Sequence, residues 1–131
     1  SPRAGAGGGL AGYWRGVAMP IQNWSDTILV VDLADDPQCT DDLNSILESI
    51  ESRPNVDVVL NFTGVTFLNS SNIAKLLKLR KILVANHRRK LKLCGISTHV
   101  WGVFLVTGLD KIFEFADDVA SGLASLQMNE P

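Results

Sequence analysis

The chain has 131 residues, of which 46% are hydrophobic and 20% are charged, and its formal net charge is −2. These values are typical of a globular protein with one hydrophobic core, and the length excludes two domains of ordinary size. No apolar run approaches the roughly 20 residues that span a bilayer, and the N-terminus lacks the pattern of a signal peptide. We therefore expect a cytoplasmic protein that does not insert into a membrane.

The charges are unevenly distributed along the chain. Nine of the 14 acidic residues lie between Asp26 and Asp57, whereas Val58–Leu109 contains none and carries eight of the 12 basic residues. The simplest interpretation is a molecule whose helices have solvated surfaces of opposite sign. The basic residues are not interleaved with exposed aromatic residues, so we expect no binding of nucleic acid. A partner surface of acidic character would fit the basic part.

The N-terminal part predicts a tail followed by a hairpin. Residues 1–12 are rich in glycine and alanine and are expected to form a flexible tail or a cloning remnant, which leaves residues 13–131 as the domain. Tyr13–Gln22 predicts an edge strand, and Thr27–Leu33 predicts a β-branched strand. The short polar segment Asn23–Asp26 between them predicts a turn, so the two strands should pair antiparallel.

The rest of the chain alternates between helix and strand patterns. Four helices are expected, and three further strands lie between them. The first helix begins at Thr40, the second spans Asn72–Asn86, the third runs from Ser97 or Thr98 to Val106, and the fourth spans Asp117–Leu126. The three strands are Val56–Phe62, Leu91–Ile96 and Ile112–Phe115. This order predicts an α/β fold. We expect one domain with a mixed, largely parallel sheet of four to five strands, an N-terminal antiparallel hairpin, and about four helices packed against the sheet.

The expected helix over residues 72–86 has an apolar face and a basic face. On a helical wheel its apolar residues fall on one arc, with two lysines and one isoleucine opposite. The inward set is Ile73, Leu76, Leu77, Leu83 and Val84, and the outward set is Lys75, Lys78 and Ile82. Ile82 is therefore expected to be an exposed apolar residue, which is common on protein surfaces.

The sequence offers little that indicates catalysis or cofactor binding. Cys39 and Cys94 are predicted to be buried thiols, because one lies beside a helix start and the other inside an apolar strand. His87 and His99 have no cysteine or carboxylate at metal-ligand spacing, which predicts no metal site. A phosphate-binding loop, a dinucleotide fingerprint and a nucleophile elbow are all lacking, so we predict a protein that is not an enzyme and binds no cofactor.

The most informative segment is Val58–Ser71, which reads VVLNFTGVTFLNSS. It contains an apolar strand, a polar turn, a second apolar stretch and then two adjacent serines where a helix begins. The first N–H groups of a helix lack partners within the helix, so a hydroxyl at this point can cap the helix or carry a phosphate that the helix end stabilises. Both a structural and a regulatory role are open.

Asn61–Ile73, which reads NFTGVTFLNSSNI, resembles the signature of the STAS domain family, the anti-sigma factor antagonists and their relatives. The family pattern is roughly D-L-S-x-V-x-F-[IM]-D-S-[ST]-G-[LI]. The order of the expected elements agrees with that family from the Thr27–Leu33 strand to the C-terminal helix. The resemblance therefore implies a STAS-like domain that works as a binding module.

By this resemblance, Ser70 is the hydroxyl phosphorylated by an anti-sigma factor that is also a serine kinase, with Ser71 as the alternative. The unphosphorylated form would bind that kinase, and a phosphatase would restore it. The sequence departs from the pattern at two positions, where Asn69 replaces an aspartate and Asn72 replaces a glycine. Two alternatives are a STAS scaffold without phosphorylation and a transporter-associated STAS subunit. The oligomeric state is left open.

The expected partner surface surrounds the two serines and continues along the helix that follows them. The signature junction and the densest positive charge lie on this one element. The surface consists of Asn69, Ser70, Ser71, Asn72, Lys75 and Lys78.

Overall fold

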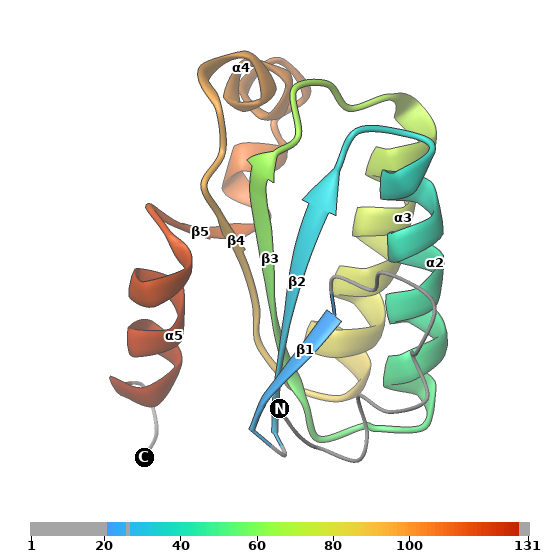
Figure 1. Ribbon diagram of the computed structural model, residues 1–131, viewed down its shortest axis with the longest axis vertical. Coiled ribbons are helices and arrows are strands. Elements are labelled where there is room, and N and C mark those ends of the chain that lie inside the picture. Colours follow the sequence, from blue (N-terminus) through green and yellow to red (C-terminus); the bar gives the residue numbers. More distant parts are fainter. Residues whose placement is uncertain (1–20, 26, 129–131) are drawn as a thin grey trace.

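The computed structural model describes residues 21–25 and 27–128 (Figure 1). Strands and helices alternate along this part of the chain. The strands are β1 (Ile21–Ser25), β2 (Ile28–Ala34), β3 (Asp57–Gly64), β4 (Leu91–Cys94) and β5 (Glu114–Ala116). The helical elements are α2 (Gln38–Glu51), α3 (Ser70–Arg80), the π-helical η2 (Lys81–Asn86), α4 (Thr98–Thr107), the short 3₁₀ helix η3 (Leu109–Lys111) and α5 (Val119–Met128).

The sheet has the strand order β1-β2-β3-β4-β5. The four strands from β2 to β5 are all parallel, and β1 lies antiparallel along the β2 edge. The predicted hairpin is wrong in position. The segment expected to turn, 23–26, supplies most of β1, and Ser25 already pairs with Ile28, so the connection is shorter than predicted. The strand expected over residues 13–22 lies outside the described residues except for its last two.

Helices cover both faces of the sheet (Figure 1). On one face α2 and α3 pack side by side, and on the other face α5 packs alone. The strands alternate between these two faces as the two-residue period of a strand requires. In β3, for example, Val58, Leu60 and Phe62 belong to the large core cluster under α2 and α3, whereas Val59 belongs to a small cluster under α5.

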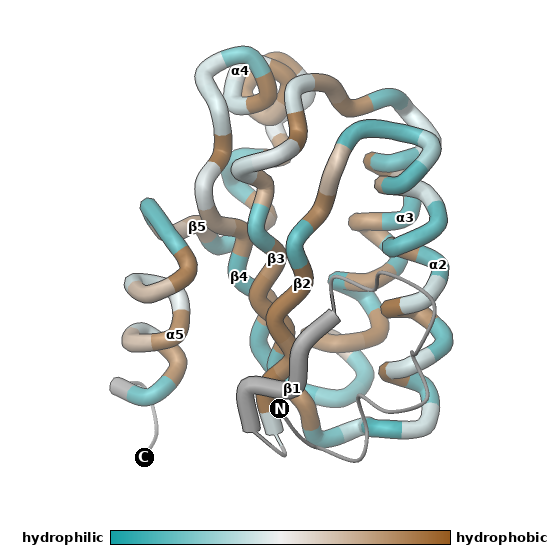
Figure 2. Tube along the Cα trace, viewed as in Figure 1, coloured by the Kyte–Doolittle hydropathy of each residue, from teal (hydrophilic) through white to brown (hydrophobic). Residues whose placement is uncertain are grey.

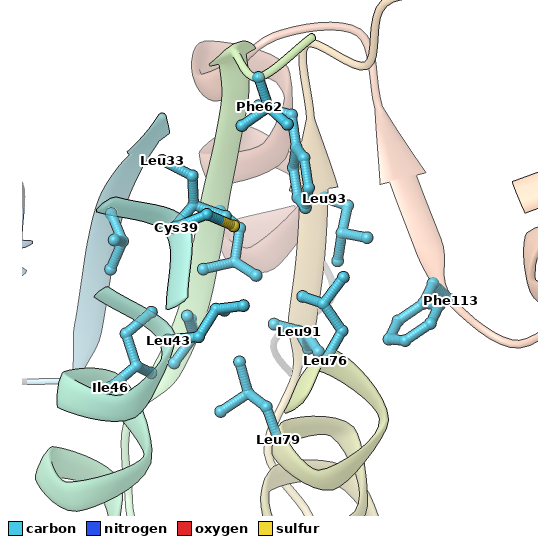
Figure 3. Packing of buried hydrophobic residues seen from close by; sticks show 14 of the residues in the cluster. Leu33, Cys39, Leu43, Ile46, Phe62, Leu76, Leu79, Leu91, Leu93 and Phe113 are labelled. Carbon is cyan, nitrogen blue, oxygen red and sulfur yellow. The ribbon is translucent and has the colours of Figure 1, made fainter. Parts of the chain in front are cut away.

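The large cluster fills the space between the sheet and the helices (Figure 3). Leu43 and Ile46 from α2, and Leu76 and Leu79 from α3, meet the strand residues there. Both thiols are buried, as predicted, Cys39 in this cluster and Cys94 in the small one. Burial raises the pKa of Cys39 to about 12 and that of Cys94 to about 11, so neither is a reactive thiolate at neutral pH.

The helix that follows the serines spans the predicted residues, but its faces are not those predicted. Leu77 is 37% exposed, whereas Leu79 is fully buried and Ile82 packs against the core. The predictions of an inward Leu77 and an exposed Ile82 are therefore wrong. Within α3 the buried face is centred on Asn72, Leu76 and Leu79, so the predicted apolar arc was placed to one side of it and Leu77 falls at its margin. Ile82 lies beyond Lys81, where the helix becomes π-helical and the wider turn changes the direction of the side chains that follow.

The last two elements lie close to their predicted places. The strand expected over Ile112–Phe115 forms later, as β5, because η3 precedes it. In α5, Leu123 and Leu126 are buried in the small cluster and Val119 packs against it, as predicted. None of the helices within the described residues is long and apolar enough to cross a membrane.

Candidate functional site

The serine pair lies at the edge of the sheet where β2 and β3 both end. These strands are parallel neighbours, so their carboxyl ends and the loops that follow them meet at the same edge, at the top of Figure 1. In Figure 2 the lower parts of both strands are hydrophobic, and hydrophilic segments interrupt them toward this end. Here the Asn61 amide donates to the Asp32 carboxylate at 3.0 Å, which ties the two strand ends together.

Asp35, directly after β2, holds the loop that leads to α3. Its carboxylate accepts hydrogen bonds from the Thr66 backbone N–H at 2.7 Å, the Thr66 hydroxyl at 2.6 Å and the Phe67 N–H at 3.3 Å. These donors stabilise the charged form and lower the Asp35 pKa, the Thr66 hydroxyl most of all. The loop is thus held by one ionised side chain from the neighbouring loop.

Asn69 and Asn72 close the start of α3 with a reciprocal capping box. The Asn69 side-chain oxygen accepts from the Asn72 N–H at 2.8 Å, and the Asn72 side-chain oxygen accepts from the Asn69 N–H at 3.1 Å. Such a box satisfies two backbone donors at once, and Asn72 here takes the role that Glu or Gln usually has. Asn69 is therefore the N-cap residue, and Ser70 is the first residue of the helix.

The amide nitrogens of both asparagines bind Asp36. Asn69 Nδ2 donates to Asp36 Oδ2 at 2.7 Å, and Asn72 Nδ2 lies 3.3 Å from each Asp36 oxygen and 3.2 Å from the Thr40 hydroxyl. The Thr40 hydroxyl and the Thr40 N–H also donate to the Asp36 carboxylate. The bond from the hydroxyl is the main cause of the lowered pKa of Asp36, and the bond from the N–H lowers this pKa further. One carboxylate therefore joins the N-termini of α2 and α3.

Ser70 and Ser71 are both exposed. Within the described chain, neither hydroxyl has a hydrogen-bond partner, so neither serves as the helix cap. In the first turn of α3, the Asn72 N–H is taken by Asn69 Oδ1 and the Ile73 N–H by the Asn69 carbonyl. The N–H groups of Ser70 and Ser71 remain as the donors at the positive end of the helix dipole. An anion attached to either serine would meet them.

The structure places the other predicted surface residues less uniformly. Lys78 is exposed, Lys75 and Asn69 are half-buried, and Asn72 is only 1% exposed. Asn72 therefore acts by holding the loop rather than by presenting its side chain. Phe67, which was not among the predicted surface residues, is 56% exposed and lies just before the capping box.

The contact of Asp35 and Asp36 with the serine junction was not predicted from the sequence. They are 31 to 36 residues away from their partners in the sequence. A signal was nevertheless present, because an acidic pair followed one parallel strand and the signature loop followed the next. Neighbouring parallel strands bring such loops together at one sheet edge.

Comparison with known proteins agrees with this fold. The STAS domain model matches residues 28–122, and the chain therefore belongs to the STAS domain family. A crystal structure of a putative anti-sigma factor antagonist from Thermotoga maritima is similar with a TM-score of 0.72 and 13% identity, over 83% of this chain and 94% of that one.

Two further structures show how widely the fold is used. The phosphorylated form of the Bacillus cell-fate determinant SpoIIAA gives a TM-score of 0.59 at 21% identity, over 76% of this chain and 91% of that chain. A sulfate transporter family protein from Wolinella succinogenes gives 0.63 at 17% identity, over 78% and 84%. At such identities these similarities establish the fold alone.

Proposed function

We propose that this chain is an anti-sigma factor antagonist-like regulator, a non-catalytic cytoplasmic protein that binds an anti-sigma factor kinase and is controlled by phosphorylation of Ser70. The observation that carries the proposal is an exposed, unpartnered hydroxyl at the positive end of α3, in a family that includes antagonists. Ser71 is the alternative acceptor. A phosphatase would restore the binding form.

The helix start supports a phosphate on Ser70 without refolding. Its cap is supplied by Asn69, so modifying Ser70 removes no capping bond. The two backbone N–H groups left over at Ser70 and Ser71 favour an anion, as does the helix dipole. The first turn of α3 contains no acidic residue of its own.

The same phosphate would change the surface that a partner meets. It adds about −1.5 to −2 charges beside a residue that already binds the ionised Asp36. The unmodified surface combines the two hydroxyls with the exposed Phe67 and Lys78. A partner that packs closely on this surface would have to desolvate the phosphate, so we expect phosphorylation to release it.

The test uses a kinase encoded beside the gene for this chain. The purified chain is incubated with this kinase and ATP, and the modified residue is mapped by mass spectrometry. We expect phosphate on Ser70, loss of kinase binding in Ser70→Asp, and retained binding in Ser70→Ala. Ser71→Ala and Ser71→Asp are the matched controls, since that serine is also exposed. An unmodified chain whose two Ser70 variants bind the kinase equally well would refute the proposal.

A STAS scaffold without a phosphoswitch, including a transporter-associated subunit, is the second candidate. The observation that favours it is the complete hydrogen-bonding of the junction by Asn69, Asn72 and Asp36, which leaves the serines no structural task and supplies no carboxylate at position 69. Partner binding that is unaffected by Ser70→Asp would favour this candidate.

A further inference from the structure

At the end of α3 and η2 remote from the serines, the surface contains a basic hollow of about 270 Å³. It is lined by Arg80 and Val84 from the helix, by residues 88–91 that lead into β4, and by residues 112–114 that lead into β5. Arg80 follows Ser70 by ten positions, which corresponds to about 15 Å along an α-helix. The hollow is therefore separate from the serine junction.

Four cationic residues line this hollow, and its single acidic residue is already neutralised. The cations are Arg80, Arg88, Arg89 and Lys90. The carboxylate of Glu114 binds Lys92 Nζ at 2.6 Å. The hollow therefore has an excess of positive charge.

Two of the arginines are held in place by other contacts. Arg80 Nε donates to the Ile112 carbonyl at 3.1 Å, which fixes the guanidinium while leaving its terminal nitrogens free of described partners. Arg89 binds the buried Asp57 through two nitrogens, at 3.1 and 3.3 Å, and Asp57 also accepts from the Lys90 N–H at 2.8 Å. The segment that carries Arg88 and Lys90 is thus anchored to the core.

Arg88 and Lys90 are the free charges of the hollow. Within the described residues, neither side chain has an ion pair or a hydrogen bond. Arg88 also has φ of 58°, a left-handed conformation that is uncommon for residues other than glycine. Arg88 follows the end of η2, and the Arg89 N–H donates to the Leu83 carbonyl at 2.7 Å, so this left-handed residue terminates the helix and sets the course of the segment that lines the hollow.

We propose that this hollow binds a small organic phosphate, with Arg80, Arg88 and Lys90 contacting the phosphate and the apolar wall contacting the organic group. Arginine guanidinium groups suit phosphate oxygens in geometry and charge. The apolar wall consists of Val84, Leu91, Ile112 and Phe113. Ile112 is 40% exposed, so this wall is accessible from solvent.

The test is a titration of the ¹⁵N-labelled chain with phenyl phosphate, followed by backbone amide shifts at 0.15 M salt, where weak surface attraction is largely screened. Saturable shifts are expected for residues 88–91 and 112–114. Arg88→Asn with Lys90→Gln should weaken binding at least tenfold, since the loss of a single charge-assisted hydrogen bond already costs about that much. Asparagine tolerates the left-handed conformation, so this variant should fold.

The matched control is Lys75→Gln with Lys78→Gln, which removes the same charge from positions of α3 that do not line the hollow and should leave the affinity unchanged. Equal weakening in the two double variants, or shifts that do not saturate, would overturn the proposal. Inorganic phosphate binding as tightly as phenyl phosphate would overturn the role of the apolar wall. Ser70→Ala should bind phenyl phosphate like the parent chain, so this test is independent of the phosphoswitch.

Discussion

Asn69→Asp restores the family residue at the N-cap, and in this chain we expect it to destabilise the fold. Asn69 Nδ2 donates to the Asp36 carboxylate at 2.7 Å, so an aspartate here would place two carboxylate oxygens in contact. The new residue can still accept from the Asn72 N–H, so the cap itself survives. The variant therefore isolates the contact between positions 36 and 69.

The size of the effect follows from this geometry. Two unit charges separated by that distance repel by about 1.5 kcal/mol in the dielectric of water, which applies because Asp36 is exposed. The lost hydrogen bond destabilises the fold by about 1 kcal/mol more, whereas the new negative charge at the helix N-terminus stabilises it by about 0.5 kcal/mol. Relaxation of exposed side chains reduces the sum, which leaves a net loss of about 1–2 kcal/mol and a fall in Tm of about 4–8 °C.

The assay is a double-mutant cycle of chemical denaturation at pH 7 with Asn69→Asp, Asp36→Asn and the double variant. The double variant exchanges the carboxylate and the amide between the two positions and so restores an N–H···O bond. Its loss of unfolding free energy should therefore be smaller than the sum of the two single losses by at least about 1 kcal/mol. The Asn69→Asp penalty should shrink as the pH falls and one carboxyl becomes protonated. Additive single effects, or an Asn69→Asp variant more stable than the parent, would refute the reasoning.

Two further predictions concern buried and crowded positions. Asp42 is buried, and its Oδ2 has no hydrogen-bond partner among the described residues. Burial raises the pKa of Asp42, because the charged form is less favourable in the folded chain. Asp42→Asn should therefore raise the free energy of unfolding by about 1 kcal/mol at pH 7, measured by urea denaturation. Gly95 has φ of 70°, and a Cβ there would lie 2.6 Å from the Thr63 hydroxyl oxygen, so Gly95→Ala should lower that free energy by about 2 kcal/mol or more.

Each of these variants has an internal check. The Asp42→Asn gain should disappear as the pH falls below the ordinary range of an aspartate, because the neutral acid carries no charge to desolvate; a gain that is independent of pH would contradict the assignment. For Gly95, the matched control is Gly102→Ala in α4, where a Cβ would meet nothing within 4 Å. It should stabilise the chain by about 0.5–1 kcal/mol. Equal effects at the two glycines would contradict the steric argument.

The sequence predicted the elements whose signal is local. The strand β3, the helix start at the serines and the inward face of α5 all follow from short patterns of apolar and capping residues. The register of β1 was not predictable in the same way, because the polar segment 23–26 satisfies turn chemistry as well as it fits an edge strand. The phase of the helix after Lys81 was lost because nothing in the pattern announced a π-helical turn.

Of the candidate site, the residues at the start of α3 were predicted from the sequence, and Asp36 was not. The two serines and two asparagines lie in one continuous segment, so their placement at a helix start could be read directly. Asp36 comes from the preceding crossover, and its contacts depend on the parallel pairing of β2 with β3 and on how the two loops fold back. Which of several acidic residues would meet the junction is a property of the packed fold.

The two buried thiols lie under different amounts of cover, and this makes them separate reporters of chain opening. Cys94 lies under α5, a single helix whose packing on that face involves only a small cluster, and Gly122 of α5 passes close enough that a Cβ would lie 2.7 Å from its Sγ. Undocking of α5 alone would expose Cys94 to an alkylating reagent, whereas Cys39 requires the large cluster to open. Labelling should therefore proceed in two kinetic phases, the faster at Cys94, and the difference measures how far the C-terminal helix moves independently of the rest.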